Sequence, residues 1–216
     1  MFRILCLLIG YVFGLFQTAY FYGKSKGIDI REHGSGNSGT TNALRVMGTK
    51  AGLIVFAGDC IKCILAVTLV RLLFARSYGD TMELLALYTA AGCILGHNYP
   101  FYMNFKGGKG IAATAGLIIS LHPLFIPVGL LSFFGTFMIT HYVSLGSLLV
   151  YATLMAEMIL LGQNGVFEGL TQMQLYEMYA VTFLLAVMAY WKHKDNIVRL
   201  IHGNERKTYL FKKNEV

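Results

Sequence analysis

The stretch AGLIVFAGDCIKCILAVTLV, residues 51–70, contains only two charged side chains, those of Asp59 and Lys62. Its length matches the roughly 20 residues that an α-helix needs to cross the hydrocarbon core of a bilayer. The rest of the chain has the same character, since 56% of its 216 residues are hydrophobic and 13% are charged. Soluble domains carry about 25% charged residues. We therefore expect an all-α integral membrane protein that forms a single domain over residues 1–216.

Seven apolar segments predict a bundle of seven transmembrane helices. They cover residues 4–22, 51–74, 83–99, 110–122, 124–140, 143–162 and 177–191. The segment 110–122 is short because Pro123 disfavours helix at the residue before it, so this helix must be sheltered by neighbours or end at a polar site. A five-span arrangement with a re-entrant segment over 110–140 is the alternative topology. The first segment lacks a convincing cleavage site, so we interpret it as a retained helix, not a signal peptide.

The cations of the chain gather in alternate connections between these segments. Five lie between the first and second segments, two lie between the third and fourth, and seven follow the last, among them Lys212 and Lys213. Cytoplasmic loops collect Lys and Arg, so we expect the N-terminus outside and the C-terminus in the cytoplasm. The net charge of +7 suits anionic headgroups and phosphorylated substrates. No recognisable reader module accompanies these dispersed cations, which argues against a nucleic-acid partner.

The loop GSGNSGTTNALR, residues 34–45, begins with the pattern G-x-G-x-x-G. Asp59 even stands where a dinucleotide-binding fold has its ribose carboxylate, but that motif must follow a strand, whereas a membrane helix precedes this loop. The glycines still let backbone N–H groups approach a ligand, and hydroxyls, amides and a guanidinium surround them. We therefore predict an anion-binding loop instead of a flexible linker. Its candidate residues are Ser35, Gly36, Asn37, Thr41, Asn42 and Arg45.

A second loop, GHNYPFYMNFKGGKGIAATAG over residues 96–116, has related chemistry. Two ammonium groups flank glycines just where a helix is expected to begin, so the positive end of that helix can face an anion. Met103 and Ile111 exclude a Walker A loop, which needs Gly and a hydroxyl at those positions. Lysines that merely flank a span are the alternative interpretation. The candidate substrate-binding residues are His97, Lys106, Gly107, Gly108, Lys109 and Gly110.

The third group is HKDNIVRLIHGNERK, residues 193–207, directly after the last apolar segment. His193 and Asn196 are three residues apart, so they share a face if the helix continues. Ser144, in YVSLGS, lies at the end of an earlier segment. In the seven-span arrangement these groups and both loops fall on the cytoplasmic side. We therefore expect one site at the cytoplasmic interface.

Together, the three motifs closely resemble, in order and spacing, those of the bacterial membrane glycerol-3-phosphate acyltransferases that use acyl phosphate as donor, the PlsY-like family. The resemblance implies an inner-membrane enzyme with a cytoplasmic active site and no metal or nucleotide cofactor. It would transfer a fatty acyl group from acyl phosphate to the 1-position of glycerol 3-phosphate, giving lysophosphatidate and phosphate, the first acylation of phospholipid synthesis. By position it implies catalytic roles for Ser35, His193 and Asn196 and a structural role for Glu205, with Ser144 and the loop residues at the substrates.

Four positions depart from the family pattern. Ser38 and Thr40 stand where Pro and Ala are usual, His141 replaces an Arg, and Asn204 replaces a Thr. None of these is a residue to which we assign chemistry. The C-x-x-C formed by Cys60 and Cys63 lies inside a span, and we interpret it as a pair of small apolar residues.

Two other functions are open to the sequence. A membrane acyltransferase using acyl-CoA or acyl carrier protein needs similar loops. An organic-phosphate transporter would favour a site near the bilayer midplane and repeated halves, and we find no repeats. For the enzyme, direct transfer is the preferred mechanism, with Ser35 as a donor to phosphate. If His193 is the base, activity should fall near its unperturbed pKa of about 6.5 unless the site shifts it.

Overall fold

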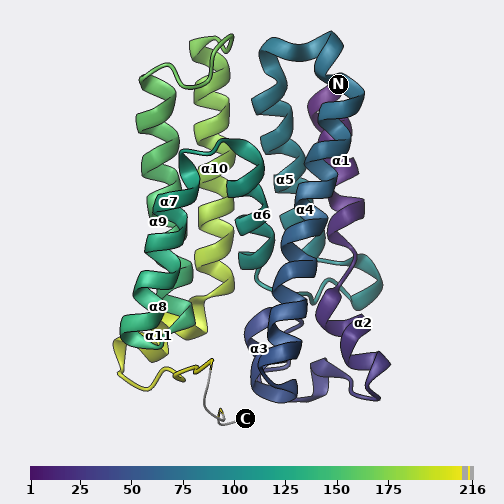
Figure 1. Cartoon of the computed structure of the whole chain (residues 1–216), viewed down its shortest axis with the longest axis vertical. Coiled ribbons are helices and arrows are strands. Elements are labelled where there is room, and N and C mark those ends of the chain that lie inside the picture. Colours follow the sequence, from purple (N-terminus) through teal and green to yellow (C-terminus); the bar gives the residue numbers. More distant parts are fainter. Residues whose placement is uncertain (211–213, 215–216) are drawn as a thin grey trace.

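The structure, a computed structural model, describes residues 1–210 and residue 214, and all regular elements in this part of the chain are helical. Figure 1 shows a bundle of roughly parallel helices with the N-terminus at one end. Lys212 and Lys213, counted among the tail cations, lie outside the described residues. The α-helices are α1 (Phe2–Gly14), α2 (Thr18–Ser25), α3 (Thr40–Met47), α4 (Thr49–Tyr78), α5 (Met82–Asn98), α6 (Ile111–Leu121), α7 (Phe125–Leu130), α8 (Thr136–Thr140), α9 (Val143–Gln163), α10 (Gln172–Lys192) and α11 (Lys194–Ile201). Short elements are η1 (Ile30–Glu32), η2 (Gly79–Thr81), η3 (Phe101–Met103) and η4 (Leu131–Gly135), the last a π-helical turn between α7 and α8.

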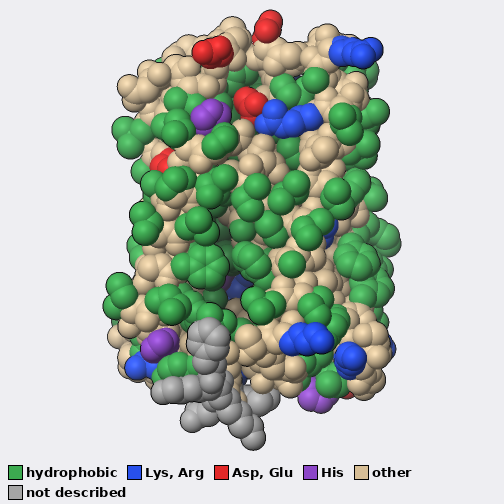
Figure 2. Space-filling view, in the orientation of Figure 1, with side chains coloured by type: hydrophobic (Ala, Val, Ile, Leu, Met, Phe, Trp, Pro, Cys, Tyr) green, Lys and Arg blue, Asp and Glu red, His purple; other side chains and the backbone are tan. Residues whose placement is uncertain are grey.

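The described helices have the length and polarity of membrane spans. Four stretches are long and apolar enough to cross a bilayer, namely Phe2–Ser25, Thr49–Met103, Val143–Gln163 and Gln172–Lys192. The second of these contains α4 and α5, which are joined at η2. Ile111–Leu121 and Phe125–Thr140 are shorter apolar stretches. Hydrophobic side chains cover the middle of the visible face, and charged side chains lie mostly towards its two ends (Figure 2).

The first apolar segment is interrupted, which corrects the prediction of one helix over residues 4–22. α1 ends at Gly14 and α2 begins at Thr18, with an extended backbone at Gln17 between them. The freed carbonyl oxygens have a buried cationic partner, since Lys62 Nζ donates to Phe16 O at 2.6 Å and to Gly14 O at 3.2 Å. A polar group inside the second span thus satisfies a break in the first, because exposed carbonyls are costly in hydrocarbon.

The short helix α6 ends at a polar site, as expected from its length. Arg71, on α4, donates from Nη2 to Ser120 O at 2.9 Å and forms an ion pair with Glu83 at 2.7 Å. The guanidinium therefore satisfies a carbonyl at the C-terminus of α6, where the helix dipole also favours a cation.

Helices α1 and α5 approach each other through glycines. Gly10 and Gly14 lie on α1, Gly92 and Gly96 lie on α5, and each would place a Cβ against backbone of the opposite helix. A Cβ on Gly92, for example, would lie 2.0 Å from Leu7 O. Small residues spaced four apart allow such close packing of membrane helices. Because these glycines have no side chain, the backbones of α1 and α5 come into direct contact.

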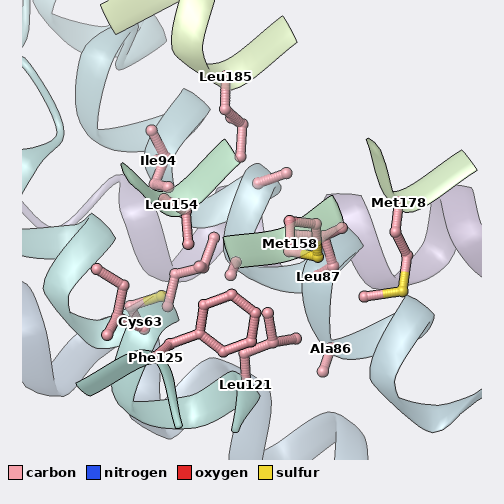
Figure 3. Close-up of a cluster of buried hydrophobic side chains, with 14 of the residues drawn as sticks. Cys63, Ala86, Leu87, Ile94, Leu121, Phe125, Leu154, Met158, Met178 and Leu185 are labelled. Carbon is pink, nitrogen blue, oxygen red and sulfur yellow. The ribbon is translucent and has the colours of Figure 1, made fainter. Parts of the chain in front are cut away.

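A buried hydrophobic cluster packs α4, α5, α9 and α10 together. It includes Cys63 on α4, Leu87 on α5, Leu154 on α9 and Met178 on α10 (Figure 3). The four cysteines are free and buried, as expected for small apolar residues. This packing fixes the ends of α5, α6, α9 and α10 relative to one another, and the sequence motifs lie at those ends.

Candidate active site

The three motifs lie at one end of the bundle. α3 and α11 lie at the end opposite the N-terminus (Figure 1). Two hydrogen bonds connect distant motifs directly: Arg45 on α3 donates to Arg206 O, and Lys109 from the loop before α6 donates to Asn196 on α11. The motifs therefore converge, as expected, at one end of the described part of the bundle.

The first loop is shaped by the side chain of Asn42. Its Oδ1 accepts from Ser35 N at 2.9 Å, and its Nδ2 donates to His33 O at 3.0 Å. Gly34 and Gly36 take positive φ angles of 61° and 68°, which a side chain would oppose. Asn42 is buried, and its amide hydrogen-bonds to the backbone of the loop. Ser35 is exposed, and its hydroxyl has no protein partner among the described residues.

Arg45 reaches from α3 to the tail after α11. Its Nη2 donates to Thr208 Oγ1 at 2.7 Å and to Arg206 O at 3.1 Å. Its Nε is buried with no partner in the described part of the chain, and so are the hydroxyl oxygens of Ser38 and Thr40. Burial lowers the pKa of Arg45 from its ordinary value, yet a guanidinium stays charged at neutral pH. Buried donors without partners are costly, so this region favours an anion.

The glycine loop of the second motif packs directly on the end of α5. Gly108 N donates to His97 O at 3.0 Å and Gly107 N donates to Asn98 O at 3.2 Å. The backbone amides of Gly107 and Gly108 thus donate to carbonyls at the end of α5. They could donate to a phosphate, as predicted, only if the loop opened. The amides of Lys109 and Gly110 have no hydrogen-bond partner in the described residues. Gly110 has a φ of 82° and is the N-cap of α6.

Glu205 is the centre of a buried hydrogen-bond network. Its Oε1 accepts from Asn196 Nδ2 at 2.6 Å and from Ser144 Oγ at 2.9 Å, and its Oε2 accepts from Arg199 Nε at 2.7 Å. Burial by itself would raise the pKa of Glu205, but the donors from Asn196, Arg199 and Ser144 hold it below its usual value. The carboxylate is therefore ionised and connects α9, α11 and the tail.

Lys109 and His193 face this network from its edge. Lys109 Nζ donates to Asn196 Oδ1, and burial, with neighbouring Arg199 and Arg45, lowers the pKa of Lys109 to about 8. His193 Nδ1 lies 2.8 Å from Ala189 O, and because a carbonyl only accepts, Nδ1 carries the proton. Burial and then the charge of Lys109 lower the pKa of His193 to about 4. At neutral pH, His193 is therefore uncharged, with a lone pair on Nε2.

Two of the predicted substrate-binding residues differ in exposure. His97 is 2% exposed and packs against Gly107 and Gly108, while Lys106 is exposed. Sequence reasoning missed Arg199 and Thr208. Arg199 follows Asn196 by three residues and so shares its helix face, which was a usable signal. Thr208 carried none. Within the described residues, no three His, Cys, Asp or Glu side chains form a group suited to a metal ion.

Comparison with known proteins agrees with this geometry. The family profile described as glycerol-3-phosphate acyltransferase matches residues 4–203. The chain belongs to the glycerol-3-phosphate acyltransferase family. Its relatives include the protein of that name from Thermoanaerobacter sp. (strain X514), which is 36% identical over 208 residues, covering 96% of each chain. Another, from Desulforamulus reducens, is 40% identical over 200 residues, covering 93% of this chain and 90% of the relative.

Solved structures of the family have the same architecture. The crystal structure of PlsY (YgiH), an integral membrane glycerol 3-phosphate acyltransferase, in its glycerol 3-phosphate form superposes with a TM-score of 0.80. The two chains are 28% identical, with 97% of this chain and 99% of the other covered. The lysophosphatidic acid form of PlsY gives a TM-score of 0.77 at 27% identity, with 96% of each chain covered. This member of the family is therefore an all-helical integral membrane protein.

Proposed function

We propose that this membrane enzyme transfers a fatty acyl group from acyl phosphate to the 1-hydroxyl of glycerol 3-phosphate, with lysophosphatidate and phosphate as products. The observation that carries the proposal is the cationic site at one end of the bundle. Arg45 and Lys109 lie there beside a neutral, buried His193, and several donors are unspent. Two phosphorylated substrates need such donors, and the acyl chain of one of them needs the apolar helix surface that adjoins the site.

The reaction needs little covalent help from the protein. The 1-hydroxyl oxygen attacks the acyl carbon, the new ester C–O bond forms, and the bond from the acyl carbon to the phosphate oxygen breaks. The leaving group departs as inorganic phosphate. Because acyl phosphate is a mixed anhydride and already activated, positioning by Arg45, Lys109 and the loop amides supplies much of the rate enhancement.

The proton of the hydroxyl goes more readily to a substrate phosphate than to His193. The second pKa of a phosphate monoester, at which the monoanion becomes the dianion, is about 6. Burial and Lys109 hold the pKa of His193 at about 4, so the imidazole is the weaker base. Its Nε2 lone pair is then a hydrogen-bond acceptor that orients the alcohol, and Asn196 holds Lys109 beside it.

Ser35 acts in this mechanism as a hydroxyl donor to phosphate. It lies in a glycine loop with positive φ angles, and its hydroxyl has no base among the described residues. Rapid quench with labelled acyl phosphate and no acceptor tests this point. A stoichiometric acyl adduct on Ser35, formed and consumed at the turnover rate, would refute direct transfer.

The proposed topology has seven spans in a bacterial inner membrane, with the N-terminus outside and the site and C-terminus in the cytoplasm. The shorter stretches Ile111–Leu121 and Phe125–Thr140 then count as spans, together with α1 and α2 as one interrupted span and α4, α5, α9 and α10. The charge distribution supports this orientation.

One assay separates the proposed donor from the alternatives. Purified protein is given radiolabelled glycerol 3-phosphate with acyl phosphate, acyl-CoA or acyl carrier protein, each offered alone. We expect labelled lysophosphatidate only with acyl phosphate, and none from an Arg45→Met variant, with exposed Arg206→Met as the matched control. Product from either thioester alone would assign the other donor. Uptake of label into vesicles without acylation would favour the transporter.

A further inference from the structure

A buried polar cluster lies beneath the glycine loop, outside the network around Glu205. Asp59 and Lys62 on α4 and His97 on α5 are 1%, 5% and 2% exposed. Lys62 Nζ lies 2.9 Å from Asp59 Oδ1 and 2.9 Å from His97 Nδ1. Thr18 Oγ1 donates to the same aspartate oxygen at 2.9 Å. Charged groups are expensive to bury in a membrane protein and are usually retained for function.

Lys62 joins two parts of the molecule. Its ammonium donates to the carbonyls at the break between α1 and α2, and it also reaches the imidazole of His97. An ammonium has only donors, so Nδ1 of His97 must be the acceptor in this contact. The neutral ring then carries its proton on Nε2.

That second nitrogen faces the glycine loop. A Cβ placed on Gly108 would lie 2.0 Å from His97 Nε2, and a Cβ on Gly107 would lie 2.1 Å from His97 O. Gly108 N also donates to His97 O. Nε2 has no hydrogen-bond partner in the part of the chain that the structure describes. The ring edge therefore supports the loop and directs an unused N–H towards it.

We propose that Asp59 and Lys62 are positioning residues that fix the tautomer of His97, so that its Nε2–H supports the glycine loop and the phosphate of glycerol 3-phosphate bound there. The inference rests on the proposed function. In this proposal the contact of His97 with the substrate depends on Lys62, whereas the sequence alone suggested a contact that His97 makes by itself. It also gives a function to the two charges inside the second span, which the reaction itself does not use.

The tautomer can be measured without any assay of activity. Full-length protein labelled with ¹⁵N-histidine, in lipid nanodiscs, gives nitrogen resonances for its six histidines. The His97 signals are identified by their loss in His97→Gln. We expect a neutral ring protonated on Nε2 in the unaltered protein, and a second tautomer in Lys62→Met. A wild-type ring protonated on Nδ1, or an unchanged tautomer in Lys62→Met, overturns the proposal.

Kinetics test the consequence for the loop. In Lys62→Met we expect KM for glycerol 3-phosphate to rise about tenfold, the effect of losing one hydrogen bond to an anion, while kcat changes less. His97→Gln, whose amide nitrogen can replace Nε2–H, should retain more affinity than His97→Asn. Arg71→Met removes a cation from the other end of α4 and should leave KM unchanged. An equal rise in KM in Arg71→Met would show general destabilisation and contradict the proposal.

Two further outcomes are separable. If Lys62→Met does not fold, the double variant Asp59→Asn/Lys62→Met, which removes both charges, takes its place. The tautomer of His97 in the unaltered protein tests the proposal in either case. Should the protein lack acyltransferase activity with every donor, the proposed function fails, whereas the nitrogen spectra still report whether Lys62 fixes His97.

Discussion

Arg45 makes its contacts with only part of its guanidinium. Nη2 donates to Thr208 and to the Arg206 carbonyl, while Nε is buried without a partner. Nε–H and the hydrogens of Nη1 remain available to phosphate oxygens, on edges that Thr208 and Arg206 do not occupy.

Arg45→Lys should cause a large loss of activity, about 100-fold or more in kcat/KM, because one ammonium cannot hold Thr208 and the Arg206 carbonyl and also place fixed donors at a phosphate. Steady-state kinetics with glycerol 3-phosphate as the varied substrate measure it. Exposed Arg206→Lys is the matched control and should behave as the unaltered protein. Near-normal activity of Arg45→Lys would show that charge alone suffices.

Gly108 is the second residue with a specific consequence. A Cβ there meets His97 Nε2 at 2.0 Å, so Gly108→Ala should displace the loop. We expect KM for glycerol 3-phosphate to rise more than kcat falls. Gly79→Ala is the control, since nothing lies within 4 Å of its Cβ. A kcat defect with a normal KM would contradict a binding role for the loop.

Lys109 gives the site a pH dependence. Its pKa is lowered to about 8, chiefly by burial, so the ammonium is charged below that pH and loses its proton as pH rises through it. KM for glycerol 3-phosphate should accordingly increase above about pH 8. Lys109→Arg keeps its charge and should abolish this alkaline limb. A limb that persists in Lys109→Arg would have to come from another group.

Residue identities were more predictable than residue environments. The glycines, lysines and hydroxyl residues of the three motifs were enough to predict that these residues form one site at one end of the bundle. The pKa of His193 could not be predicted, because its value of about 4 depends on burial and on Lys109, which belongs to a different loop. Likewise, the sequence suggests that the amide of Asn42 is available to a ligand, but it hydrogen-bonds to backbone up to twelve residues away.

At the scale of elements, the tightest constraint is the contact between α1 and α5. Each helix carries a G-x-x-x-G, GYVFG over residues 10–14 and GCILG over residues 92–96. The spacing was visible in the sequence, but the pairing of these two helices was not. The break at residues 15–17 was also hidden, because its partners, Lys62 and His97, come from other helices.

Gly92→Ala should destabilise the protein by overpacking this contact, by about 1–3 kcal/mol. The added Cβ meets the Leu7 carbonyl at 2.0 Å, and backbone cannot move aside as a flexible side chain can. Thermal unfolding in detergent measures the change. Gly135→Ala, with nothing within 4 Å of the new Cβ, should unfold at the original temperature. Equal stability of both variants would mean that α1 and α5 lie farther apart.

For the whole molecule, the segment boundaries were predicted to within a few residues, because hydrocarbon imposes length and apolarity on each helix. α9 covers Val143–Gln163 where 143–162 was expected, and α5 covers Met82–Asn98 where 83–99 was expected. α10 begins five residues before its predicted start, at a Thr171 capping box that the apolar pattern does not include. How the helices pack depended on glycine and arginine contacts that no single segment reveals.

The proposed orientation is a prediction for the intact molecule. Single cysteines placed at residues 35, 109 and 194, in a chain whose four native cysteines are replaced, should react with a membrane-impermeant thiol reagent only in inverted vesicles. A cysteine at residue 80, in the turn η2, should react only from the other side. Labelling of residues 35 and 109 from opposite sides would exclude a shared site.

The bond between Arg45 and Thr208 spans most of the chain, and this sets an order of assembly. During synthesis, Arg45 leaves the ribosome long before Thr208 and Glu205 are added. A nascent chain already inserted in the bilayer therefore holds an incomplete site, in which Arg45, Lys109 and Ser144 lack the groups that position them. Catalytic competence therefore depends on residues that are among the last to be added, and a ribosome stalled before residue 205 would carry a membrane protein without activity.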